Sequence, residues 1–191
     1  MILAGGQSRR MGREKLILEV GGMPLIEHVR NALADSCQEV LVVGGETIRL
    51  KETDYVSDER AGRQGPLAGI EAGLAASKHD HVFVAAGDMP FLSPGLVAYL
   101  LGRLGRGGVV AAIPHHGGRS HPLCGAYVRA LLPRVSAVLD GGTRAVGELL
   151  EGTVGVEYVG EELLRFGEPD LLLMNVNSPL DLERARREAG R

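Results

Sequence analysis

From Leu3 to Lys15 the chain reads LAGGQSRRMGREK, and the rest of the sequence is arranged around this stretch. Its apolar start predicts the end of a β-strand, and Gly5 and Gly6 let the backbone turn sharply and approach a ligand closely. The stretch holds four cations and one anion, which are Arg9, Arg10, Arg13, Lys15 and Glu14. A cationic, glycine-rich strand end predicts a polyphosphate-binding loop. The alternative is an ordinary turn with a solvated basic face.

The spacing excludes two familiar phosphate-binding loops. A P-loop carries lysine and then serine or threonine directly after its last glycine, whereas Lys15 lies three positions after Gly12 and precedes Leu16. Gly5, Gly6 and Gly12 also lack the G-x-G-x-x-G spacing of dinucleotide-binding folds.

The pattern L-A-G-G-x-S-x-R-M-G-x-x-K resembles the signature of nucleotidylyltransferases with a glycosyltransferase-A-like fold. Four further motifs are similar to those of the molybdenum cofactor guanylyltransferases, the MobA family: GPLAG from Gly65, GDMP from Gly87, HPL from His121 and NVNSP from Asn175. The resemblance extends from residue 3 to about residue 187, nearly the whole chain. The double glycine together with GPLAG favours the guanylyl branch, because cytidylyl relatives usually carry L-A-A-G at the first motif.

Composition predicts a soluble protein in which residues 1–191 form a single domain. Apolar residues make up 45% and charged residues 24% of the 191 residues, which is ordinary for a globular enzyme. The net charge of −3 argues against binding of nucleic acid, and no apolar run reaches the length of a membrane helix. Cys37 and Cys124 lack metal-ligand spacing and are expected to be packing residues. With no signal peptide apparent, we expect a cytoplasmic location.

Alternating strand and helix patterns predict an α/β fold. We expect a three-layer, Rossmann-like architecture of the nucleotide-diphospho-sugar transferase type, with a mostly parallel central sheet and helices on both faces. The predicted strands are a short one ending at residue 3 and residues 16–20, 39–43, 55–57, 81–86, 109–113, 154–159 and 171–174. The predicted helices are residues 24–34, a helix opening at 65–66, and residues 94–104, 130–139, 144–150 and 179–187. Residues 115–121 are expected to form a polar loop.

Ligands of such sheets bind beyond the carboxyl ends of the strands, and three predicted groups lie there. They are the glycine loop, Asp88 after strand 81–86, and Asn175 with Asn177 after strand 171–174. Asp88 is the predicted Mg²⁺ ligand, because one carboxylate with substrate phosphates and water suffices for this ion; the family resemblance implies the same role. Asn177 is a second candidate ligand. The alternatives are a turn cap for Asp88 and a helix cap for Asn177.

The predicted catalytic residues are Lys15, Asp88 and Arg10. Lys15 would neutralise the triphosphate and the departing pyrophosphate, with Arg10 assisting. Asp58 is the candidate for reading guanine, since a carboxylate can accept from both N1–H and the exocyclic amine. The residues expected around the nucleotide are Leu3, Ala4, Gly5, Gly6, Lys15, Asp58, Gly65, Pro66, Leu67 and Asp88. One departure weakens the guanine assignment, because Gly44-Gly45-Glu46 stands where the family uses an asparagine.

A cluster of His115, His116, Arg119 and His121 keeps three interpretations open: a metal site, a site for an anionic acceptor, or plain surface residues. The turn from Gly141 to Arg144 could likewise contact the acceptor or cap a helix.

The resemblance implies Mg²⁺-dependent transfer of GMP from GTP to the terminal phosphate of molybdopterin or Mo-molybdopterin, with release of pyrophosphate. The alternatives are a cytidylyl- or other nucleotidylyltransferase acting on molybdopterin or another small phosphate, and a non-catalytic GTP-binding carrier. Transient contact with other cofactor-biosynthesis proteins or with molybdoenzyme chaperones is the expected protein partnership.

Overall fold

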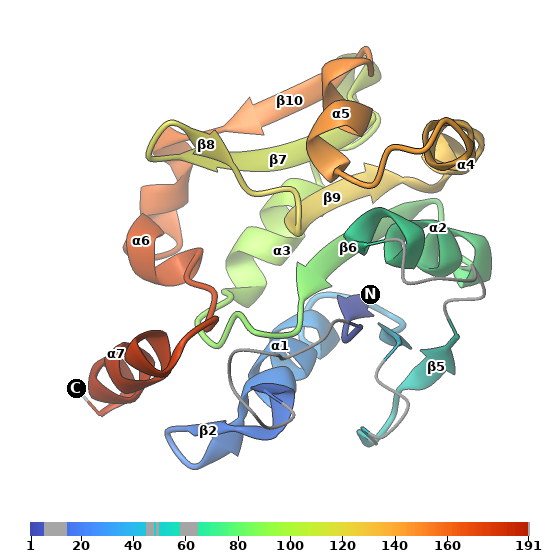
Figure 1. Cartoon of the computed structure of the whole chain (residues 1–191). Helices are drawn as coiled ribbons and strands as arrows, with labels where there is room; N and C mark the ends of the chain where they lie inside the picture. The colour runs from blue at the N-terminus through green and yellow to red at the C-terminus, as the bar shows by residue number, and fades with distance from the viewer. Residues whose placement is uncertain (6–14, 45–47, 49, 58–64, 191) are drawn as a thin grey trace.

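The computed structural model describes residues 1–5, 15–44, 48, 50–57 and 65–190. Seven strands lie side by side in the order β10-β7-β9-β6-β1-β4-β5, and β8 pairs with β7 (Figure 1). The strands of this sheet are β1 (Ile2–Leu3), β4 (Leu41–Val43), β5 (Asp54–Val56), β6 (His81–Ala86), β7 (Ala111–His116), β8 (Arg119–Ser120), β9 (Cys124–Val128) and β10 (Val156–Val159). A separate hairpin joins β2 (Glu19–Val20) to β3 (Met23–Pro24).

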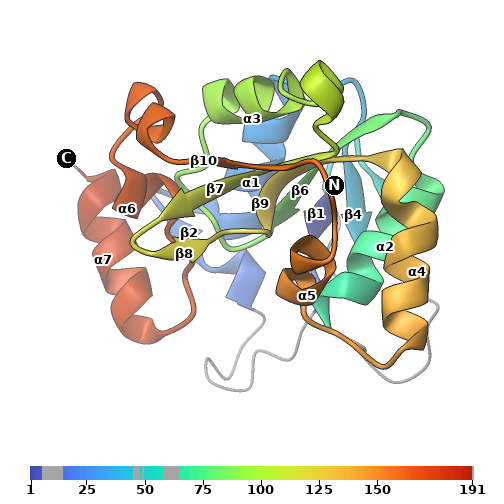
Figure 2. The same cartoon turned by 90° about the horizontal axis from the view of Figure 1, so that it is seen from above.

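Helices cover both faces of the sheet, as Figure 2 shows. The helices are α1 (Leu25–Ala34), α2 (Pro66–Ala76), α3 (Pro94–Leu101), α4 (Leu132–Asp140), α5 (Val146–Glu151), α6 (Pro169–Leu172) and α7 (Pro179–Ala189). One core cluster joins the sheet to α1, α3 and α6, and a second joins its other face to α2, α4 and α5. Side chains of β6 alternate between the two, with Phe83 in the first and Val82 and Val84 in the second. The predicted three-layer α/β architecture is confirmed.

The sheet is mostly parallel but contains one reversed strand near its middle. Strand β1 pairs in parallel with β4 and β6, and β10 pairs in parallel with β7. Strand β9 runs antiparallel to both β6 and β7. The carboxyl ends of the parallel strands therefore share one edge of the sheet with the amino end of β9. The segments that follow β1, β4 and β6 leave from this edge.

Helix α2 packs closely against the sheet, because its glycine and alanine residues have no large side chains to hold the helix and the sheet apart. A Cβ atom on Gly69 would lie 3.1 Å from a methyl carbon of Leu3, and one on Gly73 would lie 3.2 Å from a methyl carbon of Val43. This close approach, predicted from the run of glycine and alanine, fixes the amino end of α2 beside the ends of β1 and β4.

The structure corrects several predicted elements. Residues 171–174, predicted as the last strand, lie in and after helix α6, because Pro169 begins a helical turn there. Residues 16–20 are a 3₁₀ turn (Lys15–Ile17) followed by β2, not one continuous strand. The predicted loop at 115–121 is the β7–β8 hairpin. Strand β9 was not predicted, since its sequence CGAYV is short and does not alternate.

Two further expectations concern cysteines and membrane segments. Cys37 and Cys124 are free thiols packed in the first core cluster, as predicted, and burial raises the pKa of Cys124 to about 12. Among helices in the described ranges, none has both the length and the apolar character of a membrane span.

Tyr127 of β9 provides a stability test of the turn that precedes this strand. Its hydroxyl is buried and donates a 2.7 Å hydrogen bond to the carbonyl oxygen of Pro122. Tyr127→Phe leaves this acceptor without its partner, so we expect a loss of about 1–2 kcal/mol in the free energy of unfolding. Urea titration of the variant measures the loss. Tyr158→Phe is the control, because Tyr158 is 50% exposed; equal stability of the two variants would contradict the assignment.

Candidate functional site

The site is centred on the ammonium group of Lys15. Its Nζ donates to Asp88 Oδ2 at 2.5 Å and to Asn177 Oδ1 at 2.9 Å. The other carboxylate oxygen of Asp88, Oδ1, accepts a 2.8 Å hydrogen bond from Asn175 Nδ2. Three distant segments of sequence therefore meet at one carboxylate, and the side chain of Asp88 is only 9% exposed.

The backbone fixes Asp88 from two directions. Asp88 follows β6 at the carboxyl edge, and the amide of its neighbour Gly87 donates to the carbonyl oxygen of Leu3 at 3.2 Å. The carbonyl oxygen of Asp88 accepts from the amide of Val176 at 2.9 Å. Since Val176 lies between Asn175 and Asn177, this one bond places both asparagines beside the carboxylate. The predicted convergence of Lys15, Asp88 and the asparagines is therefore present, although no strand precedes Asn175.

A capping box holds the chain just after the asparagines. Ser178 caps α7 by accepting from the amide of Asp181, and the Asp181 carboxylate accepts from the amides of Ser178 and Asn177. These bonds outweigh desolvation and lower the pKa of Asp181. Ser178, rather than Asn177, is thus the helix cap, and this leaves the Asn177 side chain free to meet Lys15.

The ends of β1 and β4 come unusually close at two glycines. Gly44 has φ +75°, and a Cβ atom there would lie 3.0 Å from both Cα and N of Gly5. The two backbones therefore nearly touch here, and neither residue carries a side chain. Leu3 is half-buried, Ala4 is buried and Gly5 is exposed, so Gly5 is the residue of β1's end that a ligand can reach.

Gly44→Ala tests the importance of this approach. An alanine would adopt a left-handed backbone and press on Gly5, so we expect about 1–2 kcal/mol lower stability from the backbone strain and a raised KM for the nucleotide. Gly105→Ala is the matched control, because Gly105 has φ +79° but no atom within 4 Å of its added Cβ. Thermal unfolding and nucleotide KM are measured for both. A nucleotide KM that rises equally in both variants would show that the contact with Gly5 does not matter.

The amino end of α2 also reaches this edge. Gly65 has φ +77° and caps the helix, and Pro66 is its first residue. Gly65 and Pro66 are exposed, whereas Leu67 is completely buried in the second core cluster. Any contact of Leu67 with a nucleotide would therefore use its backbone. A Cβ on Gly65 would lie 3.4 Å from the carbonyl oxygen of Arg144, which places the turn before α5 beside this helix end.

Three predicted site residues, Gly6, Arg10 and Asp58, lie outside the described residues. Their roles remain predictions. Lys15 is hydrogen-bonded to both Asp88 and Asn177. The same edge of the sheet also holds the predicted nucleotide contacts Leu3, Ala4, Gly5, Gly65 and Pro66. Asn175 had been placed at this edge without a role; the NVNSP motif was the signal for its contact with Asp88.

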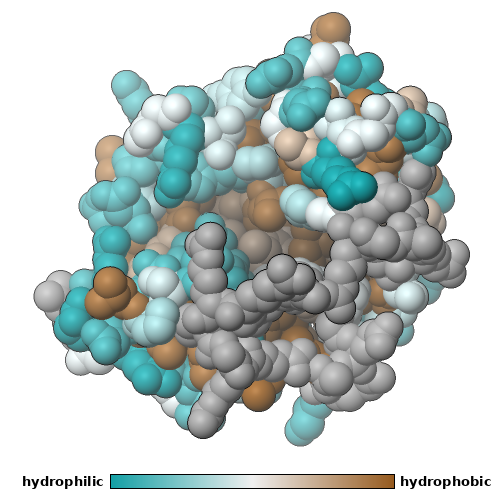
Figure 3. All heavy atoms as spheres, in the orientation of Figure 1, coloured by the Kyte–Doolittle hydropathy of each residue, from teal (hydrophilic) through white to brown (hydrophobic). Residues whose placement is uncertain are grey.

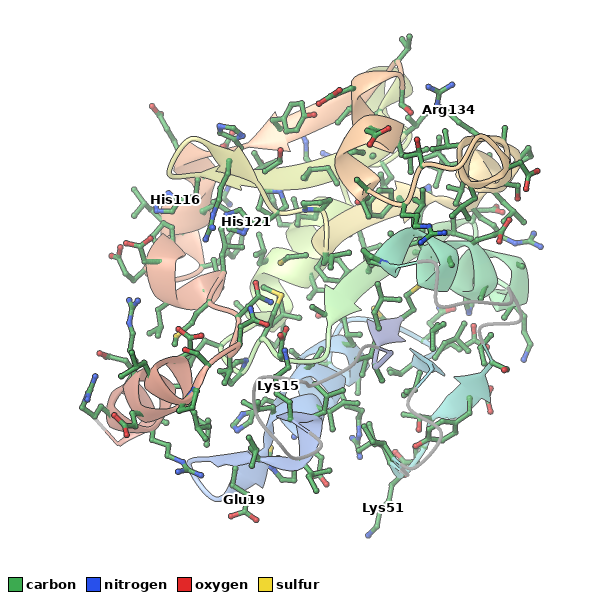
Figure 4. All side chains as sticks on the ribbon, in the orientation of Figure 1. Lys15, Glu19, Lys51, His116, His121 and Arg134 are labelled. Atoms are coloured by element: carbon green, nitrogen blue, oxygen red, sulfur yellow. The ribbon has the colours of Figure 1, made fainter. Side chains whose placement is uncertain are left out.

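Figure 3 shows that this face of the molecule is hollowed, with hydrophobic residues on the floor and hydrophilic residues along its margins. In the same orientation, Figure 4 places Lys15 on one side of the hollow and His116 and His121, from the β7–β8 hairpin and the residue after it, on the other. His116 Nε2 lies 3.2 Å from Asp170 Oδ1. The histidines therefore line the same side of the sheet as the lysine, but they form a separate group.

The oxygens around Lys15 fit a metal ion. Asp88 Oδ2 and Asn177 Oδ1 point at one cationic atom, the Nζ of Lys15. Carboxylate and amide oxygens are the ligands of hard divalent ions, so these two side chains could hold such an ion if the ammonium group moved to a phosphate. No group of three or more His, Cys, Asp or Glu in the described ranges is arranged to hold a metal. A metal here would thus need substrate oxygens and water.

This arrangement can orient and neutralise a polyphosphate at the carboxyl edge of an α/β sheet. The protein is accordingly a nucleotidyltransferase. A family model, the MobA-like NTP transferase domain, matches residues 1–154, and the chain belongs to this family.

Individual relatives agree. The chain is 36% identical over 188 residues to a probable molybdenum cofactor guanylyltransferase of Pelotomaculum thermopropionicum. The matched region covers 97% of this chain and 90% of the relative. It is 32% identical to the molybdenum cofactor guanylyltransferase of Syntrophotalea carbinolica, over 98% of this chain and 90% of the relative. The crystal structure of molybdopterin-guanine dinucleotide biosynthesis protein A from Archaeoglobus fulgidus superposes with a TM-score of 0.82 at 29% identity, covering 99% and 97% of the two chains.

Proposed function

We propose that this protein transfers GMP from GTP to the terminal phosphate of molybdopterin or its molybdenum-loaded form, giving a guanine dinucleotide cofactor and pyrophosphate. The contact of Lys15 with both Asp88 and Asn177 carries the proposal, because it brings a phosphate-binding cation and the oxygen ligands for a metal ion to one point. The relatives that are 36% and 32% identical are named as guanylyltransferases of this cofactor.

The chemistry needs no enzyme nucleophile. An oxygen of the acceptor phosphate attacks the α-phosphorus of GTP, the bond to the bridging oxygen breaks, and pyrophosphate leaves with the electron pair. Lys15 binds the triphosphate and offsets the charge that develops on the leaving pyrophosphate. The hollow holds both substrates in line, so positioning supplies a large part of the rate.

Asp88 and Asn177 hold the divalent ion that nucleotidyltransferases of this class generally use, and we propose Mg²⁺. When bound, the ion would neutralise phosphate oxygens in the manner of a Lewis acid. Asn175 orients the carboxylate by donating to its second oxygen, so that Oδ2 faces the substrate side. Asp58 remains the proposed reader of guanine, and Gly5, Gly6, Gly65 and Pro66 are the proposed backbone contacts of the nucleotide.

We further propose that residues 1–191 act as one domain in this reaction. The family model ends at residue 154, but Asn175 and Asn177 lie beyond that point and bond to Asp88 and Lys15. A chain that stopped before α6 would lose half of the proposed metal site.

Pyrophosphate release tests the proposal. Purified protein is assayed with GTP, CTP, ATP and UTP, each with and without molybdopterin, in Mg²⁺, in Mn²⁺ and after chelation. We expect release with GTP only when molybdopterin and a divalent ion are both present. Preferred turnover of CTP would make the enzyme a cytidylyltransferase, and GTP binding without release would make it a carrier.

A further inference from the structure

The turn that leads into β9 is firmly held at the edge of the sheet where Asp88 lies. The amide of Cys124 donates to the carbonyl oxygen of His121 at 3.0 Å. The amide of His121 donates to the carbonyl oxygen of Pro114 at 2.8 Å. The amide of Ala86 donates to the carbonyl oxygen of Leu123 at 2.8 Å. His121 and Asp88 each lie two residues from this last bond, within about 7 Å of it along their chains.

The ring of His121 has one nitrogen without a partner. Its Nε2 is buried and makes no hydrogen bond, and the backbone of His116 lies near the ring and favours its protonated form. In the neutral tautomer with its proton on Nδ1, the ring presents the lone pair of Nε2 as an acceptor. A buried acceptor without a donor is costly, so this nitrogen is suited to a ligand that brings a proton.

The charges around His121 favour an anionic ligand. Desolvation and the positive charge of Arg119 lower the pKa of His121, and His116 and His115 add to this effect. The carboxylate of Asp170 on α6 contacts His116. His121 is thus a neutral imidazole among cationic or potentially cationic neighbours. A metal site fits poorly, since no three-ligand group was found among the residues that the structure describes.

We propose that Nε2 of His121 binds the terminal phosphate of the acceptor through one shared proton, beside the nucleotide site at Asp88. This inference rests on the proposed function for the identity of the acceptor. A phosphate monoester loses its second proton near pH 6, close to the range of an imidazole. Whichever group carries the proton, a single N···H···O bond joins them, and the remaining phosphate oxygens stay free to attack the α-phosphorus.

The proposal predicts proton uptake when the acceptor binds. At pH 8 the free phosphate and the free imidazole are both mostly deprotonated, so formation of the shared bond takes up close to one proton. Calorimetric titration of the protein with molybdopterin, in buffers of different ionisation enthalpy, measures this uptake without any turnover. His121→Phe keeps a ring of similar shape but lacks the lone pair, so uptake should disappear and the molybdopterin Kd should rise about ten- to a hundredfold.

His81→Phe is the matched control, because His81 is exposed at the amino end of β6, the opposite edge of the sheet. It should bind molybdopterin with the wild-type Kd and proton uptake, and all variants should keep the wild-type Kd for GTP. If His121→Phe does not fold, His121→Gln serves, since its amide cannot titrate and must also abolish uptake.

Retained uptake and an unchanged molybdopterin Kd in a folded His121 variant would overturn the proposal and leave Nε2 as the acceptor for a buried water. Pyrophosphate release separates this failure from failure of the proposed function. A wild-type protein that binds molybdopterin with proton uptake but releases no pyrophosphate would refute the enzymatic activity and retain the His121 site.

Discussion

Asp88→Asn is expected to lower the rate of pyrophosphate release by at least about a thousandfold, because it removes the buried carboxylate that we propose as the ligand holding a metal ion against the triphosphate. Asparagine keeps the size and shape of the side chain. The backbone bond between Asp88 and Val176 also remains, so the fold should survive. Asp88→Ala should be equally inactive but less stable, since it leaves Lys15 and Asn175 without their shared partner.

Asp80→Asn is the matched control, because Asp80 is exposed just before β6, at the opposite edge from Asp88. It should retain wild-type turnover. Steady-state rates over a series of Mg²⁺ and Mn²⁺ concentrations show whether activity is lost through weaker metal binding, which more metal restores, or through a slower reaction of the metal-bound enzyme. Near-wild-type turnover of Asp88→Asn at saturating Mg²⁺ would refute the role of the carboxylate.

Lys15→Met is expected to reduce kcat/KM for GTP by about a hundred- to a thousandfold, the range found when one charge-stabilising group is removed from an active site. Methionine retains most of the apolar stem of lysine and removes the charge together with its hydrogen-bond donors. The structure adds a second expectation with the opposite sign. Lys15 Nζ is hydrogen-bonded to the oxygens of Asp88 and Asn177 that a divalent ion would use. In the absence of nucleotide, the variant should therefore bind Mn²⁺ more tightly than the wild type does.

Slower turnover together with tighter metal binding is a combination that simple misfolding does not produce. Lys51→Met is the control, since Lys51 is exposed and Figure 4 shows it far from Lys15. Mn²⁺ affinity is measured by electron paramagnetic resonance without nucleotide. Weaker Mn²⁺ binding in Lys15→Met would show that the lysine does not compete for these oxygens.

Much of this fold was predictable because its strands and helices are local patterns. The strand 81–86 is a continuous apolar run and was placed without error, as was the helix that opens at Pro66. The ends of such strands then predicted where Lys15 and Asp88 would meet, since parallel strands present their carboxyl ends at one edge.

The failures of prediction have physical causes. Residues 171–174 are apolar enough for a buried strand, yet Pro169 starts a helix, and short apolar runs carry no period that separates the two. Strand β9 was missed because Gly125 and Ala126 have little strand propensity. A side chain at position 125 would have to displace Ile113, since an added Cβ would lie 2.6 Å from a side-chain carbon of Ile113.

The sequence by itself determined the α/β class, the family and the pairing of a cationic glycine-rich turn with a lone aspartate, because short motifs and strand patterns encode them directly. Only the tertiary structure decided which atoms meet. The bond between Val176 and Asp88 spans 88 positions of the chain, and it holds the backbone between the two asparagines against the residue that carries the carboxylate. The unpartnered nitrogen of His121 was equally invisible in the sequence, because burial and hydrogen bonding arise only when distant segments pack together.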